Sequence, residues 1–395
     1  MTPAARVAAA ISILDNILAG QSAEQALSAW GRKSRFAGAK DRAALRDLVF
    51  DALRKRASCA ALGGGLHGRG LMLGCGIQEN WDLEAVFSGQ GHAPTSLTEA
   101  ERALCANPST LNGAIAVDLP DWTWTQFQAD LSGRASAIAG TLRNRAALFL
   151  RVNSRKTLAA QAAEALLEDG VTAIPHPNVD GCLVVTDNPR RLQRARAYLE
   201  GWVEVQDAAS QLAVSGLSIP KDATVLDYCA GGGGKALAIA DRFDVRVTAH
   251  DSNTGRMHDI AARAARAGVA IDIVTPTDLK PDRRFDVVIV DAPCSGSGTW
   301  RRNPEAKWAL TPEKLTSFQQ LQSDILRKAA QFLTPGGRLV YMTCSIFNAE
   351  NRDVANSFLE AAPKYMPTEK MDLYPSPDWD GFFCQSFVAP PTTLG

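Results

Sequence analysis

The sequence lacks any apolar run long enough to cross a membrane. A transmembrane helix needs about 18 or more consecutive apolar residues, and the 395-residue chain contains no such run. The apolar stretch after Arg6 is interrupted by Asp15, and Val7, Ile11 and Leu14 recur at helical spacing. This stretch predicts an amphipathic helix rather than a signal peptide. We therefore expect a cytoplasmic protein without a membrane partner.

Cysteines are few, and the chain has no excess of either charge. Eight cysteines are scattered over the sequence without a CxxC pair, which argues against a disulfide framework and against a zinc site. The 42 Lys and Arg residues balance 42 Asp and Glu residues. Neutral chains are not typical of proteins that bind nucleic acid only through its backbone. We expect reduced thiols, no metal and a monomer.

Positive charge is concentrated at the N-terminus. Residues 1–60 contain ten basic side chains and five acidic ones. The basic residues are Arg6, Arg32, Lys33, Arg35, Lys40, Arg42, Arg46, Arg54, Lys55 and Arg56. This distribution fits either a solvated helix face or a surface that contacts RNA, and the sequence does not decide between them.

The composition is that of a globular protein, and its pattern changes twice along the chain. Hydrophobic residues make up 46% and charged residues 21%, as in ordinary folded proteins. Residues 1–140 place apolar positions at helical spacing and predict an all-helical domain. Residues 141–206 combine strand-like runs such as LFLRVN with a helix, which predicts a small α/β module. Residues 207–395 form the third and largest predicted domain.

Strands and helices alternate within residues 207–395. The runs TVLDYC, VRVTAH, IDIVT, FDVVIVD and RLVYMTC are short and apolar or β-branched, and helical stretches separate them. This alternation predicts a Rossmann-like α/β fold with a mainly parallel sheet and helices on both faces. Such sheets bind ligands beyond the carboxyl ends of their strands, so we expect the chemistry there.

A glycine-rich turn follows the first of these strands. It comprises Cys229, Ala230, Gly231, Gly232, Gly233, Gly234 and Lys235. Glycines allow positive φ and let a ligand lie against the amides at the start of a helix. The turn lacks the GxGxxG spacing and the GKS or GKT ending of nucleotide-binding loops. By itself it fits S-adenosylmethionine or another nucleotide ligand.

Two acidic residues at later strand ends extend this predicted cofactor site. Asp251 ends the second strand, about twenty residues after the turn, where a carboxylate can accept hydrogen bonds from ribose hydroxyls. Asp278 follows the third strand and can meet an adenine amino group. A solvent-exposed loop aspartate explains Asp278 nearly as well.

Two cysteines follow strands that should end at the same edge of the sheet. One strand delivers Asp291, Pro293 and Cys294, and another delivers Cys344. A thiolate that adds to carbon 6 of cytosine makes carbon 5 nucleophilic enough to take a methyl group from S-adenosylmethionine. A second group must then help to remove the carbon 5 proton and to release the thiol. Asp291 is placed to hydrogen-bond the activated base.

The other thiols are predicted to fill the core, because cysteine is among the most buried residue types. They are Cys59, Cys75, Cys105, Cys182, Cys229 and Cys384. Methylation of an exocyclic amine would instead need Asn or Asp followed by two prolines and an aromatic residue, and that tetrad is absent from the sequence.

The motifs DAPCSGSGTWRRNP and TCS closely resemble those of the RNA 5-methylcytosine methyltransferases, specifically their bacterial ribosomal-RNA branch. The resemblance covers roughly residues 206–390 and includes DYCAGGGGK, PGGRLVYMTCSIFNAEN and DGFF. It implies that the Cys344 thiol attacks cytosine and that the Cys294 thiol promotes product release. It also implies S-adenosylmethionine binding by residues Cys229 to Lys235 and by Asp251, Asp278 and Asp291.

The resemblance has one departure and further implications. Gly231 and Gly232 replace the Ala and Pro of the family's CAAPGGK loop and Ala236 stands where Thr is usual, which puts the affinity for the cofactor in question. Residues 1–140 look like an antitermination-factor-type RNA-binding domain, and residues 141–206 look like a module that helps to seat RNA. Residues 207–395 would then be a class I methyltransferase domain. Ribosomal RNA is the expected partner; a transfer-RNA enzyme and a catalytically weak assembly factor are the alternatives.

Overall fold

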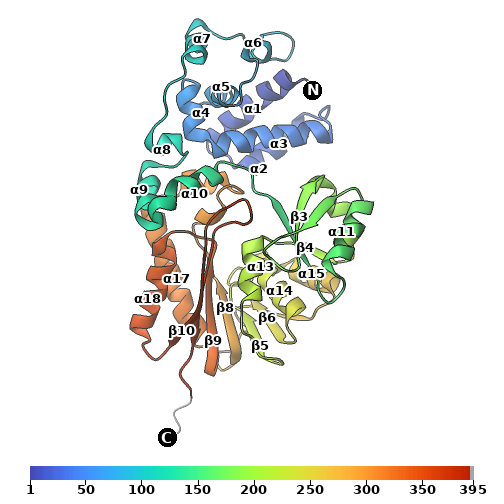
Figure 1. Ribbon diagram of the computed structural model, residues 1–395, viewed down its shortest axis with the longest axis vertical. Helices are drawn as coiled ribbons and strands as arrows, with labels where there is room; N and C mark the ends of the chain where they lie inside the picture. Colours follow the sequence, from blue (N-terminus) through green and yellow to red (C-terminus); the bar gives the residue numbers. More distant parts are fainter. Residues whose placement is uncertain (392–395) are drawn as a thin grey trace. The chain divides into compact units, whose positions relative to one another are not determined.

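Two compact units make up the computed structural model, which describes residues 1–391 (Figure 1). One unit contains Met1–Arg145 together with Trp300–Leu310. The other contains Ala146–Thr299 and the chain from Thr311 onward. None of the helices in residues 1–391 has the length and apolar character that crossing a membrane requires.

The first unit consists of helices and loops. Ser22 caps one of these helices, because its Oγ accepts a hydrogen bond from the backbone N–H of Gln25 at 3.3 Å. Apolar side chains such as Leu14, Val49 and Leu71 form one core between the helices. The helices are α1 (Pro3–Leu18), α2 (Ala23–Lys33), α3 (Ala39–Arg54), α4 (Arg56–Leu62), α5 (Gly68–Gln78), α6 (Leu83–Val86), α7 (Glu99–Ala106), α8 (Gly113–Ala116), α9 (Asp121–Leu131), η1 (Ser132–Arg134), α10 (Ala135–Leu142) and α16 (Pro304–Ala309).

Glycines in α5 allow its neighbours to approach closely. A Cβ atom at Gly74 would lie 1.9 Å from the carbonyl oxygen of Cys59 in α4. One at Gly68 would lie 2.1 Å from the carbonyl oxygen of Ile11 in α1. Any side chain at these positions would push the helices apart. Close packing therefore explains glycines that by themselves weaken a helix.

The second unit begins with a small antiparallel sheet of four strands in the order β2-β3-β1-β4. Helix α11 covers it, because Ala162 and Leu166 pack with Leu150 and Leu183 of the sheet. The elements are β1 (Leu148–Val152), α11 (Ala159–Glu168), β2 (Thr172–Pro175), β3 (Cys182–Asp187), η2 (Pro189–Arg194), α12 (Arg196–Leu199) and β4 (Val203–Val205).

The large sheet of the second unit has seven strands in the order β10-β11-β9-β8-β5-β6-β7. The strands from β9 to β7 in this order are parallel, whereas β11 is antiparallel to both of its neighbours. Its elements are α13 (Ala208–Ser215), β5 (Thr224–Asp227), α14 (Gly234–Arg242), β6 (Arg246–His250), η3 (Thr254–Met257), α15 (Ile260–Ala267), β7 (Ile271–Val274), β8 (Phe285–Asp291), η4 (Ser297–Thr299), α17 (Pro312–Ala330), β9 (Leu333–Thr343), η5 (Asn348–Glu350), α18 (Arg352–Ala361), β10 (Met366–Leu373) and β11 (Phe382–Val388).

Helices cover both faces of this sheet, with α13 to α15 on one face and α17 and α18 on the other (Figure 1). Side chains in β8 alternate between the two cores: Val287 and Ile289 face the first group of helices, and Val288 and Val290 face the second. The predicted Rossmann-like α/β fold, with a mainly parallel sheet and helices on both faces, is confirmed.

Strands β10 and β11 were not predicted from the sequence. β10 is mostly exposed along its length, and β11 is almost wholly buried, so neither shows the alternation that marks a half-buried strand. The helical stretch predicted between the strands VRVTAH and IDIVT divides into η3 and α15.

Candidate active site

The functional residues predicted from the sequence, except Asp278, lie where strands β5, β6, β8 and β9 end. The glycine-rich turn follows β5, which ends at Asp227; Asp251 follows β6, Asp291 closes β8, and Cys344 follows β9. Because these strands are parallel, their carboxyl ends form one edge of the sheet. The fold therefore brings residues separated by more than a hundred positions to a common edge.

The two strand-end thiols are neighbours. The Sγ atoms of Cys294 and Cys344 lie 3.4 Å apart, and both side chains are half-buried. A hydrogen bond with Cys344 and burial hold the pKa of the Cys294 thiol well above its usual range, and negative charge on Cys344 adds to the effect. Cys294 is therefore held as a protonated thiol while Cys344 is free.

Glu350, a residue not predicted as functional, connects the two cysteine loops. It is completely buried. Its Oε1 accepts hydrogen bonds from the backbone N–H of Ser295 at 2.7 Å and from Nε2 of Gln322 at 3.0 Å. Its Oε2 accepts from the hydroxyls of Ser295 and Ser345, the residues that follow the two cysteines. One carboxylate thus fixes both cysteine loops.

Two glycines bring a third segment against these loops. The N–H of Gly298 donates to the carbonyl of Cys344 at 2.9 Å, and the N–H of Gly381 donates to the carbonyl of Gly298 at 3.0 Å. A Cβ atom at Gly298 would lie 2.5 Å from the carbonyl oxygen of Gly381. Only glycine fits here without displacing backbone. The motif residues GSG and DGFF therefore meet next to the thiols.

Lys235 and Asp291 form an ion pair beside the thiols. Nζ of Lys235 donates to Oδ2 of Asp291 at 2.7 Å and lies 5.0 Å from the ring centre of Phe382. Burial alone would lower the pKa of the Lys235 ammonium, but the charge and hydrogen bond of Asp291 raise the pKa above its usual value. Lys235 is therefore held as an ammonium beside the side chain of Asp291.

The glycine-rich turn is held by two carboxylates. Oδ2 of Asp251 accepts from the N–H of Gly231 at 2.9 Å, and Oδ2 of Asp227 accepts from the N–H of Ala236 at 3.1 Å. Gly231 and Gly233 have φ values of 52° and 82°, in the left-handed region that favours glycine. Glycine adopts this conformation at position 231 without strain, whereas alanine at the same φ would be strained.

Asp227 carries a polar atom that no described residue satisfies. Its side chain is fully buried, and its Oδ1 has no hydrogen-bond partner within residues 1–391. Burial raises the pKa of this carboxyl to about 7, and the nearby Asp291 carboxylate acts in the same direction. An unsatisfied buried oxygen under a glycine turn, with Asp251 at the next strand end, fits a ligand such as S-adenosylmethionine that carries hydrogen-bond donors.

Two predicted site residues differ from the others. Asp278 is exposed on the loop after β7, where its carboxylate accepts a hydrogen bond from the hydroxyl of Thr275 at 2.5 Å. This hydrogen bond holds the pKa of Asp278 below its usual value. Cys229 is half-buried, and burial raises the pKa of its thiol. No described contact joins Asp278 to the thiols or to the glycine turn, whereas Cys229 belongs to the turn itself.

The topology and the site define a class I methyltransferase fold: a seven-stranded sheet with one antiparallel strand, a glycine turn after the first strand and acids at the following strand ends. Family models agree. Residues 214–383 match the model of the 16S rRNA methyltransferase RsmB/F, and residues 119–190 match the ferredoxin-like domain of RsmF/B-like methyltransferases. The chain belongs to this family of S-adenosylmethionine-dependent methyltransferases.

Curated relatives carry the same family name. The chain is 32% identical over 250 residues to ribosomal RNA small subunit methyltransferase B of Vibrio cholerae, an alignment that covers 62% of this chain and 57% of the relative. It is 31% identical over 286 residues to the protein of that name from Salmonella paratyphi B, with 68% and 66% covered. The matched region thus spans less than two thirds of these relatives.

Solved structures share the fold. The crystal structure of PH0851 has a TM-score of 0.75 at 23% identity and covers 98% of this chain and 99% of its own. A methyltransferase homologue from Pyrococcus horikoshii has a TM-score of 0.61 at 23% identity and covers 72% and 99%. At these identities the likeness concerns the fold.

Proposed function

We propose that the chain transfers a methyl group from S-adenosylmethionine to carbon 5 of a cytosine in RNA, with small-subunit ribosomal RNA as the substrate. The observation that carries the proposal is the pair of thiols 3.4 Å apart, next to the Lys235–Asp291 ion pair. The name shared by the curated relatives supports ribosomal RNA rather than transfer RNA.

In this mechanism Cys344 is the nucleophile. Its sulfur adds to carbon 6 of cytosine, which raises the electron density at carbon 5. S-adenosylmethionine supplies the electrophilic methyl group that carbon 5 takes up. Asp291, held by Lys235, accepts or shares a hydrogen bond at the edge of the base and stabilises the adduct. Asp251 would hold the ribose hydroxyls of the cofactor, since a carboxylate oxygen can accept more than one hydrogen bond.

Cys294 resolves the adduct. After methyl transfer the proton on carbon 5 is removed and the bond between carbon 6 and the Cys344 sulfur breaks. The pKa of Cys294 is raised by the hydrogen bond and charge of a free Cys344. Once Cys344 is bonded to carbon it carries no negative charge, so the pKa of Cys294 falls, although burial still raises it. A larger fraction of Cys294 is then the thiolate, the form that can take up the carbon 5 proton.

Single alanine variants test the two roles. Cys294→Ala should trap a covalent complex of protein and RNA that resists denaturation, and its turnover should fall by about 100-fold or more, the usual contribution of a positioned base. Cys344→Ala should form no complex and no 5-methylcytosine. Denaturing gels with labelled RNA report the complex. An adduct formed by the Cys344 variant would reverse the assignment.

Bisulfite mapping identifies the substrate. Ribosomal and transfer RNA are compared between cells with and without the protein. We expect one cytosine of the small-subunit ribosomal RNA to be methylated only in the cells that contain the protein. A difference confined to transfer RNA would replace the proposed substrate, and no difference in either would leave the chain as a binding factor.

A further inference from the structure

The structure divides the ten basic residues of the N-terminal segment into two groups. Six of them have partners within the helical unit: carboxylates for Arg6, Arg46 and Lys55, backbone carbonyls for Arg42 and Arg54, and an indole ring for Arg56. These six side chains have a structural explanation. The remaining four are the candidates for a surface that contacts RNA.

Those four residues lie within nine positions at the turn between α2 and α3. Arg32, Lys33, Arg35 and Lys40 are exposed and have no described hydrogen bond or ion pair within residues 1–391. Lys40 lies in the first turn of α3, where a positive charge opposes the helix dipole, whereas Arg32 and Lys33 lie in the last turn of α2, where it is favourable. The helix dipole therefore does not explain the charge of Lys40.

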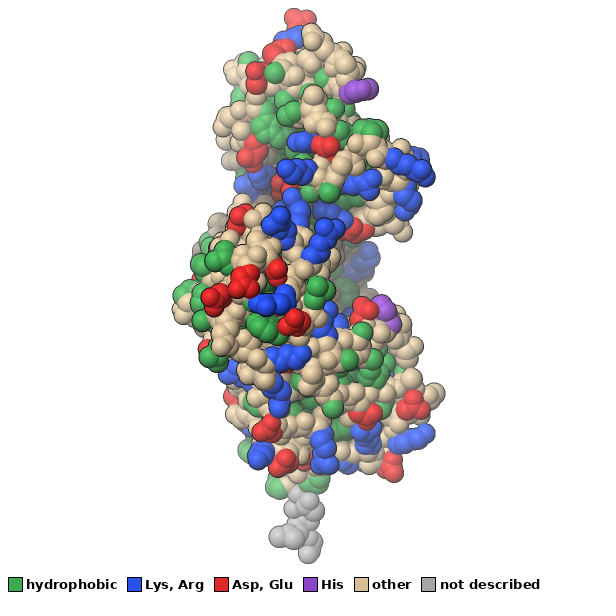
Figure 2. All heavy atoms as spheres, turned by 90° about the vertical axis from the view of Figure 1, so that its right-hand side faces the viewer, with side chains coloured by type: hydrophobic (Ala, Val, Ile, Leu, Met, Phe, Trp, Pro, Cys, Tyr) green, Lys and Arg blue, Asp and Glu red, His purple; other side chains and the backbone are tan. Residues whose placement is uncertain are grey.

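An aromatic side chain and a hollow accompany these charges. Phe36, between Arg35 and α3, is 78% exposed, the largest exposure of any large hydrophobic residue described. A hollow of about 600 Å³ is lined by Trp30, Arg32, Arg42 and the preceding residue Arg35, among others, but not by Phe36 itself. Figure 2 shows Lys and Arg side chains gathered on the surface of the helical unit. We call Arg32, Lys33, Arg35, Phe36 and Lys40 the turn patch.

The acidic residues near the turn patch are already engaged. Glu24 pairs with Arg46 at 2.5 Å, and Asp41 pairs with Arg6 at 2.8 Å and with the N-terminal amine at 3.2 Å. Neither carboxylate is left to neutralise the patch. The surface therefore keeps net positive charge around an exposed ring, which suits an anion with a flat apolar group.

We propose that the turn patch is a binding site for single-stranded RNA, with phosphates on its Arg and Lys side chains and a base stacked on Phe36. This inference rests on the proposed function, which makes RNA the substrate. Single-stranded RNA combines these features in one ligand, because its unpaired bases stack on aromatic rings while cations follow its backbone.

Variants of the full-length protein test the site. Binding of a labelled short single-stranded RNA is measured by fluorescence anisotropy at several salt concentrations. Arg32→Ala combined with Arg35→Ala should weaken binding and lower the slope of log K against log salt by about 0.7 for each phosphate that the protein no longer neutralises. Phe36→Ala should weaken binding about 5-fold to 150-fold, and Phe36→Tyr should restore it, because tyrosine keeps the stacking face.

Matched controls separate stacking from general charge and hydrophobicity. Arg102→Ala combined with Arg134→Ala removes the same charge from exposed positions of the same unit and should leave the salt slope unchanged. Phe36→Leu keeps an apolar side chain without a π-face and should bind as weakly as Phe36→Ala. Equal loss in the control pair, or full binding by Phe36→Leu, would overturn the inference. Far-UV circular dichroism checks that each variant is folded.

The outcome is independent of methyl transfer. The same titrations in the Cys344→Ala background measure RNA binding without turnover. If the parent chain makes no 5-methylcytosine, but the turn-patch variants bind RNA more weakly than the parent chain does, the proposed function fails and the site stands. If it methylates RNA and the patch variants bind like the controls, the site fails and the function stands.

Discussion

At the scale of single residues, Glu350 shows how one side chain can set the geometry of a reaction it does not touch. It accepts hydrogen bonds from the loops that carry Cys294 and Cys344, and α17 contributes a further donor through Gln322. Four donors converge on one buried carboxylate, so its loss would leave all of them without their acceptor. Glu350 is therefore a positioning residue for both thiols.

Substitutions at Glu350 should separate positioning from charge. Glu350→Ala should lower kcat by about tenfold to 100-fold and slow formation of the Cys344 adduct, because a misplaced reacting group costs rate even when it is chemically intact. Glu350→Gln should recover most of the activity, since its amide oxygen can accept from Ser295 and Gln322 while its NH₂ donates to the two hydroxyls. The KM for S-adenosylmethionine should stay constant in both. Equal activity of the alanine and parent proteins would contradict the role.

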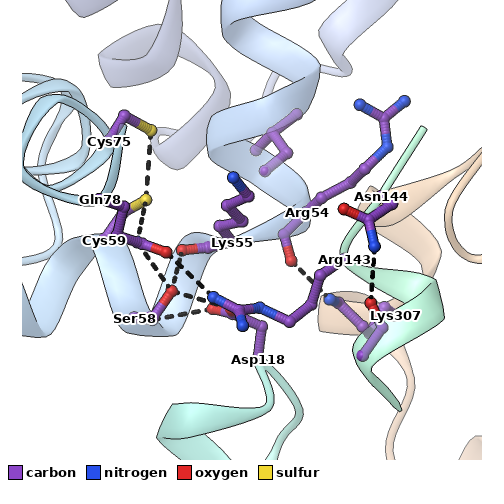
Figure 3. A network of polar contacts seen from close by, with 12 residues as sticks. Arg54, Lys55, Ser58, Cys59, Cys75, Gln78, Asp118, Arg143, Asn144 and Lys307 are labelled. Carbon is purple, nitrogen blue, oxygen red and sulfur yellow. Dashed lines mark hydrogen bonds and ion pairs between the residues drawn. The ribbon is translucent and has the colours of Figure 1, made fainter. Parts of the chain in front are cut away.

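At the scale of elements, α16 is held in the helical unit by a buried lysine. Lys307 is 1% exposed, and its Nζ donates to the carbonyl of Arg54 at 2.8 Å. Figure 3 shows it close to Arg143, whose Nε donates to buried Asp118 at 2.8 Å. Burial lowers the pKa of Lys307 to about 7 from its usual 10.5. The negative charge of Asp118 raises this pKa, whereas the positive charges of the nearby arginines lower it further.

The low pKa of Lys307 predicts a dependence of stability on pH. Between pH 7 and 10 the unfolded chain binds a proton at this lysine that the folded chain has lost, so its contribution to stability rises with pH. The gain is at most about 1.4 kcal/mol per pH unit. Lys307→Met should abolish this part of the rise, so its stability relative to the parent chain should be greatest near pH 7. Urea unfolding at several pH values measures the free energy of unfolding of the parent chain and of the variant. Parallel curves of this free energy against pH would contradict the prediction.

At the scale of the whole molecule, the order of residues along the chain and their grouping into units do not coincide. Residues Trp300–Leu310 follow the Cys294 loop in sequence, yet they belong to the helical unit. Trp300 is 1% exposed and stacks on Phe127 with ring centres 5.9 Å apart. Nε1 of Trp308 donates to the carbonyl of Leu53 at 2.8 Å. The helical unit therefore completes its core with a segment that arrives late in the chain.

A fragment containing residues 1–145 should accordingly be incomplete. Without the late segment it exposes the surface that Trp300 covers, and its thermal midpoint should rise when a peptide of residues 300–310 is added. A peptide with Trp300→Ala should bind much more weakly, because a buried tryptophan supplies about 3 to 5 kcal/mol. Calorimetry measures the binding. A fragment that is fully stable and ignores the peptide would show that the segment is dispensable.

The sequence by itself determined the features that depend on local pattern. The alternation of strands and helices predicted the parallel sheet, and strand ends followed by a glycine turn, by Asp251 or by a cysteine predicted which residues reach one edge. The Cys294–Cys344 pair was predictable for this reason. Glu350 lies in the motif PGGRLVYMTCSIFNAEN, but nothing in its local pattern distinguishes a buried carboxylate from a solvated one.

Only the tertiary structure decided which distant residues meet. It paired β11 with β9 and β10, gathered four donors around Glu350, and placed Lys307 beside Arg54. It also separated basic side chains that have partners from those that have none among the described residues, which a count of charges could not do. The physical reason is that periodicity reports how a segment is oriented to its own surroundings, whereas a contact depends on the packing of two segments that the sequence keeps far apart.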